Sequence, residues 1–197
     1  GNFVFAYLRV CKNLGFSQEE NKLLLNNIYV CDINKEALLV YKENLRDFAA
    51  SFFGIELDEE YFVTHIGGGL LFDLDSALPQ YISISDIFPS HIIRNGFNII
   101  ATNPPYKNLK AEHSHYVNDE QKNRDKNRYW SIGKLASYYF NYSTSGTLNL
   151  YRLFVEEIVE HYLTPDGICY LLIPSSILSD KSCSKIRTRL LDVCSIK

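Results

Sequence analysis

The chain has 197 residues, of which 46% are hydrophobic and 22% charged, and its formal net charge is −3. This length suits one domain, and the composition is that of a globular protein, which excludes a disordered chain or a fibrous repeat. The charge gives no overall basic signal, so any nucleic-acid contact has to come from a local patch. No apolar run is long enough to span a bilayer and the first residues lack signal-peptide features, so we expect a cytoplasmic protein without a membrane partner.

The numbers of cysteine and methionine residues lead to two further expectations. The five cysteines are odd in number and form no CxxC pair, so we expect them to be reduced and packed in the core. The chain has no methionine, so we expect it to be a piece of a longer polypeptide.

The first part of the chain alternates between helix and strand patterns. Apolar groups at three-and-four spacing indicate an amphipathic helix that Gly15 ends, and a brief β-branched run indicates a strand. Asn34 is a candidate N-cap of a second helix, which Gly54 closes. The predicted elements are a helix at 3–14, a strand at 28–31, a helix at 34–52 and a strand at 61–66.

The second part continues the alternation around a polar stretch. Residues 107–134 show no stable period, which predicts a long active-site loop over about 107–147. The apolar run ICYLLIP follows a TPDG turn and fits a central parallel strand covered on both faces. The other predicted elements are a strand at 97–101, a helix at 150–162 and a helix at 181–193.

This alternation predicts an α/β fold with an open, largely parallel sheet. Ligands of such sheets gather at the carboxyl ends of the strands. Two candidate sites follow predicted strands directly, at Asp32 and at the tetrapeptide NPPY that begins at Asn103.

The residues of NPPY suit the activation of an amine. An exocyclic amine conjugated to a ring or a carbonyl is a poor nucleophile, because its lone pair is delocalised. The side-chain oxygen of Asn103 and the carbonyl of Pro104 can each accept one N–H and draw that lone pair toward a methyl donor. Pro105 fixes the backbone so that this carbonyl points into the site, and Tyr106 can stack on an extruded base. The chemistry needs no metal; the alternative is a turn that only ends the strand.

Asp32 follows a hydrophobic strand at the position where dinucleotide-type folds bind ribose hydroxyls with a carboxylate. Ile33 beside it can lie against an adenine ring. A plain aspartate at a strand end is the alternative interpretation.

The ordered motifs resemble the adenine-N6 DNA methyltransferases of type II restriction-modification systems, particularly the large fused methylase-restriction enzymes. The opening GNF is similar to the end of the family's glycine-rich loop. IYVCDIN, IFPSHIIRNGFNIIATNPPY, LYRLFVE and a PDG turn before a strand ending in IPSS follow in the family's order. The resemblance extends over nearly the whole chain.

The resemblance implies a Rossmann-like, S-adenosyl-L-methionine-dependent methyltransferase fold. Residues 1–197 would be a partial, single catalytic domain, truncated at both ends, without the first strand and the last strands. The implied substrate is a flipped adenine in double-stranded DNA, and a target-recognition domain and an endonuclease domain are implied partners in the full-length protein. The implied cofactor-binding residues are Gly1, Phe3, Asp32 and Ile33, and the implied catalytic residues are Asn103, Pro104, Pro105 and Tyr106.

Two other functions stay open at this point. NPPY also occurs in enzymes that methylate a glutamine amide nitrogen of release factors, although these usually have a shorter segment before NPPY and lack the LYxLFxE helix. A non-catalytic remnant that binds DNA or a partner is favoured by residues 67–69, three glycines where family members often carry an aspartate.

The polar stretch after NPPY mixes cations with aromatic residues. These side chains either meet phosphates and bases or form a merely solvated loop, since acidic residues dilute their charge. His113 and His115 are interpreted as exposed polar residues rather than metal ligands. The cations and aromatics are Lys107, Lys110, Lys122, Arg124, Lys126, Arg128, Tyr116, Tyr129 and Trp130.

Overall fold

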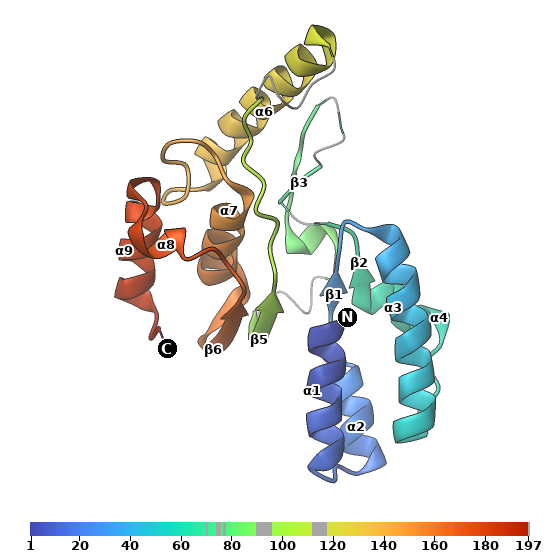
Figure 1. The fold of residues 1–197 in the computed structure, drawn as a ribbon. Helices are drawn as coiled ribbons and strands as arrows, with labels where there is room; N and C mark the ends of the chain where they lie inside the picture. Colours follow the sequence, from blue (N-terminus) through green and yellow to red (C-terminus); the bar gives the residue numbers. More distant parts are fainter. Residues whose placement is uncertain (70, 74–75, 77, 90–95, 112–117, 197) are drawn as a thin grey trace. The chain divides into compact units, whose positions relative to one another are not determined.

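The computed structural model describes residues 1–69, 71–73, 76, 78–89, 96–111 and 118–196 (Figure 1). It is a mixed α/β protein with small sheets. Its contacts divide the chain into two compact units, residues 1–70 with 83–93 and residues 71–82 with 94–197. We call these the N-terminal unit and the C-terminal unit.

The N-terminal unit packs four helices around one hydrophobic cluster, in which Leu8, Leu25, Leu45 and Phe62 are fully buried. Its two short strands, β1 and β2, pair in parallel. The elements are α1 (Asn2–Asn13), α2 (Gln18–Leu25), β1 (Val30–Cys31), α3 (Lys35–Phe48), the π-helical η1 (Ala49–Phe53), α4 (Glu59–His65), β2 (Ile66–Gly67) and the 3-10 turn η2 (Ile84–Asp86).

Local signals explain the helices that were predicted here. Gly15 follows α1 with a φ of 76°, and Gly54 follows η1 with a φ of 64°, a left-handed conformation that glycine adopts without strain. The Asn34 side chain accepts the Ala37 N–H at 3.0 Å and caps α3. Both predicted helices and the predicted cap are confirmed.

The strand predicted at residues 61–66 is wrong. Most of this stretch is helix α4, because the Asp58 side chain accepts the Tyr61 N–H at 2.8 Å and two glutamates lie in the first turn. Tyr61 and Phe62 are adjacent and both buried, so the burial does not alternate as it would in a strand with one covered face. Helix α2, not predicted either, begins with a capping box of Ser17 and Glu20.

The C-terminal unit pairs β5 with β6 in parallel and β3 with β4 antiparallel. The strand predicted at 97–101 and the helices predicted at 150–162 and 181–193 are present. The elements are β3 (Leu71–Phe72), β4 (Tyr81–Ile82), β5 (Phe97–Thr102), α6 (Asp119–Tyr139), α7 (Leu150–Glu157), the π-helical η4 (Ile158–Tyr162), β6 (Leu163–Leu171), α8 (Ser176–Ser179), the 3-10 turn η5 (Lys181–Cys183) and α9 (Ser184–Val193).

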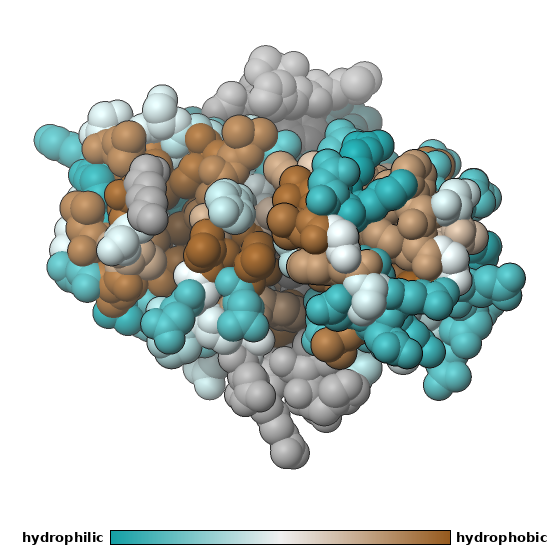
Figure 2. All heavy atoms as spheres, turned by 90° about the horizontal axis from the view of Figure 1, so that it is seen from below, coloured by the Kyte–Doolittle hydropathy of each residue, from teal (hydrophilic) through white to brown (hydrophobic). Residues whose placement is uncertain are grey.

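Strand β6 differs from the prediction in two ways. It begins before the TPDG stretch, which bulges out between the pairs Phe97↔Leu163 and Ile99↔Ile168. The strand is also not covered on both faces, because Ile168 is 53% exposed and Tyr170 60% exposed. Figure 2 shows such apolar side chains at the surface among polar ones.

The long loop predicted over residues 107–147 is also wrong in its centre. Helix α6 spans 21 residues of it, from Asp119 to Tyr139. The Asn118 side chain accepts the Gln121 N–H at 2.9 Å and starts the helix, while Ile132 and Ala136, four residues apart, are both fully buried. These two residues form a narrow apolar stripe, so periodicity gave little signal.

The strand pairs agree with the α/β class, since two of the three are parallel. All five cysteines are free, and Cys11 and Cys183 are buried. No helix within the described ranges is both long and apolar enough to cross a membrane.

Candidate active site

Asn103 follows β5 directly and has an exposed side chain, whereas Pro104 is buried. The strand end is fixed to β6, because the Leu172 N–H donates to the Thr102 carbonyl at 3.1 Å. The Tyr106 hydroxyl lies 2.5 Å from Asn103 Oδ1 and 2.6 Å from the Leu172 carbonyl oxygen. The tetrapeptide is therefore tied to both strands at their carboxyl ends.

The Tyr106 ring has one supported side and one exposed side. It makes an edge contact with Tyr151 of α7, with ring centroids 6.3 Å apart, and the residue is 46% exposed. Burial raises the pKa of Tyr151 above its usual value, so this supporting ring stays neutral. The exposed part of the Tyr106 ring is available for a flat apolar group.

The segment after Tyr106 is held by the residues that lead into α7. The Leu150 N–H donates to the Lys107 carbonyl at 3.0 Å, and the Leu109 N–H donates to the Leu148 carbonyl at 2.8 Å. The Asn149 side chain donates to Asn108 Oδ1 at 2.7 Å. Two segments far apart in sequence thus form a short antiparallel contact beside NPPY.

Two buried polar residues of α7, which sequence reasoning missed, order the approach to this contact. Arg152, 1% exposed, donates to the carbonyls of Ser145 at 3.0 Å and Ser182 at 2.7 Å, and also to that of Thr147. Glu156, 3% exposed, accepts the Asn141 N–H at 2.6 Å. An arginine and a glutamate inside the apolar pattern LYRLFVEE were the available signal, because a buried charge needs partners.

In the N-terminal unit, Asp32 lies at the carboxyl end of β1 and is exposed. Its N–H donates to the Gly67 carbonyl at 3.3 Å, and its Oδ1 accepts the Asn34 N–H at 2.8 Å. Within the described part of the chain, no hydrogen bond occupies its Oδ2. Burial, and after it the Asp32 carboxylate, raises the pKa of the Cys31 thiol to about 11, so this thiol stays protonated.

The glycines at 67–69 have distinct surroundings. A Cβ on Gly67 would lie 1.9 Å from Ile87 Cγ2, so packing within this unit demands glycine there. A Cβ on Gly69 would lie 3.2 Å from Ile33 Cβ, so the Gly69 backbone lies beside Ile33, whose side chain is 64% exposed. The space at Gly67 is filled by protein.

The other two predicted cofactor residues belong to the start of α1. Gly1 is its N-cap, and a Cβ on Gly1 would lie 2.8 Å from the Tyr41 ring of α3. Phe3 is 50% exposed. The start of α1 and strand β1 meet the same core, since Val4 and Val30 both pack against it.

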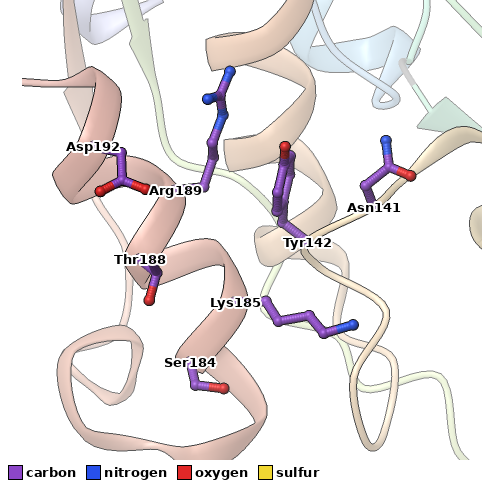
Figure 3. Close-up of a pocket in the computed structure, with 7 residues that line it drawn as sticks. All are labelled: Asn141, Tyr142, Ser184, Lys185, Thr188, Arg189 and Asp192. Atoms are coloured by element: carbon purple, nitrogen blue, oxygen red, sulfur yellow. The ribbon is translucent and has the colours of Figure 1, made fainter.

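A separate pocket of about 480 Å³ lies between α9 and the segment after α6. Figure 3 shows its polar lining; Arg189 makes two bonds to Glu160, at 2.7 and 3.1 Å, and lies over the Tyr142 ring. None of the predicted site residues lines it. The lining residues are Asn141, Tyr142, Ser184, Lys185, Thr188, Arg189 and Asp192.

Among the described residues, no three His, Cys, Asp or Glu side chains gather as a metal site. His113, His115 and Tyr116 lie outside the described residues.

The comparisons with known proteins point to one family. A model of the Eco57I restriction-modification methylase family matches residues 26–197. No curated protein and no solved structure matches the chain. The matched range contains both strand-end sites, Asp32 after β1 and Asn103 after β5, and covers most of the chain. The chain therefore belongs to the Eco57I restriction-modification methylase family.

Proposed function

We propose that this restriction-modification DNA methyltransferase transfers a methyl group from S-adenosyl-L-methionine to N6 of an adenine flipped out of duplex DNA. The observation that carries the proposal is the exposed Asn103 side chain at the carboxyl end of β5, in contact with the Tyr106 hydroxyl at 2.5 Å. An exposed amide at a strand end can reach a substrate, whereas a buried one could not.

Asn103 and Pro104 act on the acceptor amine. The Asn103 side-chain oxygen and the Pro104 carbonyl each accept one N–H, which localises the nitrogen lone pair toward the methyl donor. Pro105 restricts the backbone at this carbonyl. The exposed part of the Tyr106 ring stacks on the extruded base.

The Tyr106 hydroxyl orients the Asn103 amide. It has one hydrogen, and two oxygens lie within 2.6 Å of it, those of Asn103 and Leu172. A backbone carbonyl can only accept, so the hydroxyl donates to Leu172. Exchanging Asn103 Oδ1, the atom now beside the hydroxyl, with Nδ2 by a half-turn of the amide lets the NH₂ group donate to the hydroxyl oxygen and directs the amide oxygen toward the substrate.

The residues at β1 fit the cofactor. The exposed Asp32 carboxylate has an oxygen without a hydrogen bond inside the described part of the chain, which suits ribose hydroxyls. The exposed Ile33 side chain suits the adenine ring of the cofactor. Gly1 and Phe3, at the start of α1, would contact the methionine part of the cofactor. S-adenosyl-L-methionine supplies the electrophilic methyl group when bound.

The proposal extends to the whole chain. Residues 1–197 form one catalytic domain of Rossmann-like type with largely parallel strand pairing. The parallel pairing of β1 with β2 and of β5 with β6 supports this, since a candidate site follows β1 and β5 alike. A cytoplasmic location, and target-recognition and endonuclease domains in the full-length protein, complete the proposal.

The nature of the methylated base tests this function. The purified protein is incubated with tritiated S-adenosyl-L-methionine and mixed-sequence plasmid DNA, and the digested nucleosides are separated by chromatography. We expect the label in N6-methyladenine, because the oxygens of Asn103 and Pro104 suit an exocyclic amine. Label in methylated cytosine, or in an added release factor instead of DNA, would contradict the proposal.

A further inference from the structure

Helix α6 carries an oblique row of cations and aromatic rings that crosses its exposed side. Residues four positions apart are neighbours on a helix, each turned by about 40° from the last, so five of them form an oblique row. Trp130 is 63% exposed and Tyr138 is 82% exposed. We call this row the α6 stripe: Lys122, Lys126, Trp130, Lys134 and Tyr138.

The opposite side of α6 is anchored in the C-terminal unit. Ile132 and Ala136 are fully buried, and Tyr139 stacks on Tyr81 of β4 with ring centroids 4.0 Å apart. These contacts fix the rotation of the helix about its axis, so four residues of the α6 stripe are exposed to solvent and the fifth, Lys122, is partly buried. Figure 1 shows the start of α6 reaching away from β5 and α7.

The α6 stripe is positively charged along its length. Two of the three acidic residues of α6 lie in its first turn, and the third, Asp125, is 3.5 Å from Arg128 on another side. Lys134 Nζ lies 3.7 Å from the Trp130 ring centroid, which holds this cation over the aromatic face. No ion pair inside the described ranges joins Lys126 or Lys134 to a carboxylate.

We propose that the α6 stripe binds the phosphate backbone of duplex DNA. The spaced lysines neutralise phosphate groups, and the flat aromatic rings pack on sugars or bases between those phosphates. From Lys122 to Tyr138 the helix rises roughly 24 Å at about 1.5 Å per residue, the length of about seven base pairs. An acidic protein surface could pair with the lysines. It would not explain why the rings of Trp130 and Tyr138 are exposed in the same row.

The proposal rests on the proposed function, and it connects with that site. Lys107, the residue after NPPY, has its Nζ 5.6 Å from the ring centroid of Tyr129 in α6. The middle of α6 therefore lies beside the segment that carries Tyr106. A duplex held along the α6 stripe would have its backbone near the residues proposed to receive the extruded adenine.

The single tryptophan of the chain makes the contact measurable. A 30-base-pair duplex is titrated into the protein at low salt, while the emission of Trp130 and its quenching by acrylamide are followed. We expect bound duplex to protect Trp130. We expect Lys126→Gln/Lys134→Gln to weaken binding about tenfold and to make the slope of log affinity against log salt shallower by about 2, one unit for each lost phosphate contact.

The matched control is Lys12→Gln/Lys22→Gln in the N-terminal unit. It removes the same charge, and Lys12 also lies 3.7 Å from an aromatic centroid, that of Phe52. We expect it to bind duplex like the unchanged protein. Equal losses in both double variants, or duplex binding that leaves Trp130 as accessible as before, would overturn the proposal. The identity of the methylated base is measured in a separate experiment. Failure of the DNA-binding proposal for the α6 stripe can therefore be distinguished from failure of the proposed methyl transfer.

Discussion

Tyr106 presents two chemically different parts to its surroundings. Its hydroxyl contacts Asn103 and the Leu172 carbonyl, whereas its ring is partly exposed and supported by Tyr151. The aromatic residue could be identified from the sequence motif. Its hydroxyl contacts could not, because one of them joins residues 66 positions apart and depends on how β6 ends.

Tyr106→Phe separates these two parts. We expect the single-turnover rate of methyl transfer to fall about tenfold, the worth of roughly one hydrogen bond, while DNA affinity is kept. Tyr106→Ala should in addition weaken DNA affinity by about 1–3 kcal/mol, because stacking is lost. Tyr170→Phe, which alters an exposed tyrosine of β6, is the control. If Tyr106→Phe transfers methyl at the same single-turnover rate as the unchanged protein, the hydroxyl does not orient the Asn103 amide.

At the scale of elements, α7 organises the C-terminal unit through buried polar side chains. Arg152 donates to carbonyls on both sides of the helix in sequence, at Ser145, Thr147 and Ser182. Residues 145 and 147 precede the short contact beside NPPY. The stability of this segment therefore depends on Arg152.

Arg152→Met should lower the free energy of unfolding by about 3 kcal/mol, because three backbone carbonyls would lose the donor that the buried Arg152 side chain supplies. Arg46→Met is the control; Arg46 bonds to the exposed Glu59, a surface pair worth about 0–1 kcal/mol. Urea unfolding followed by circular dichroism compares the two variants. Similar losses for both would show that the carbonyl contacts of Arg152 contribute little.

The elements that the sequence predicted well have strong local signals. Helix α3 combines an apolar stripe with the Asn34 cap, and β5 is an apolar run stopped by prolines. Helices α4 and α6 were mistaken because their burial is set by distant partners. Phe62, for example, packs in a cluster with Leu8 and Leu25 of other helices, which no local pattern records.

At the scale of the whole molecule, the two units have different tasks in the proposed function. Under the proposed function, Asp32 and Ile33 of the N-terminal unit bind the cofactor, and Asn103 and Tyr106 of the C-terminal unit act on the acceptor base. The sequence predicted both strand-end positions. It could not predict Arg152 or the exposed side of α6, because these depend on which face of each helix the rest of its unit covers.

The most direct test measures transfer and cofactor binding in the same variants. Asn103→Ala should slow single-turnover methyl transfer by about 100-fold or more, since it removes a group that acts on the reacting amine. Calorimetry should give it an unchanged affinity for S-adenosyl-L-methionine, whereas Asp32→Ala should bind the cofactor more weakly. Asn98→Ala, at the other end of β5, is the control for both measurements. An Asn103→Ala protein that loses cofactor affinity as Asp32→Ala does, or that transfers methyl at the unchanged rate, would contradict the account.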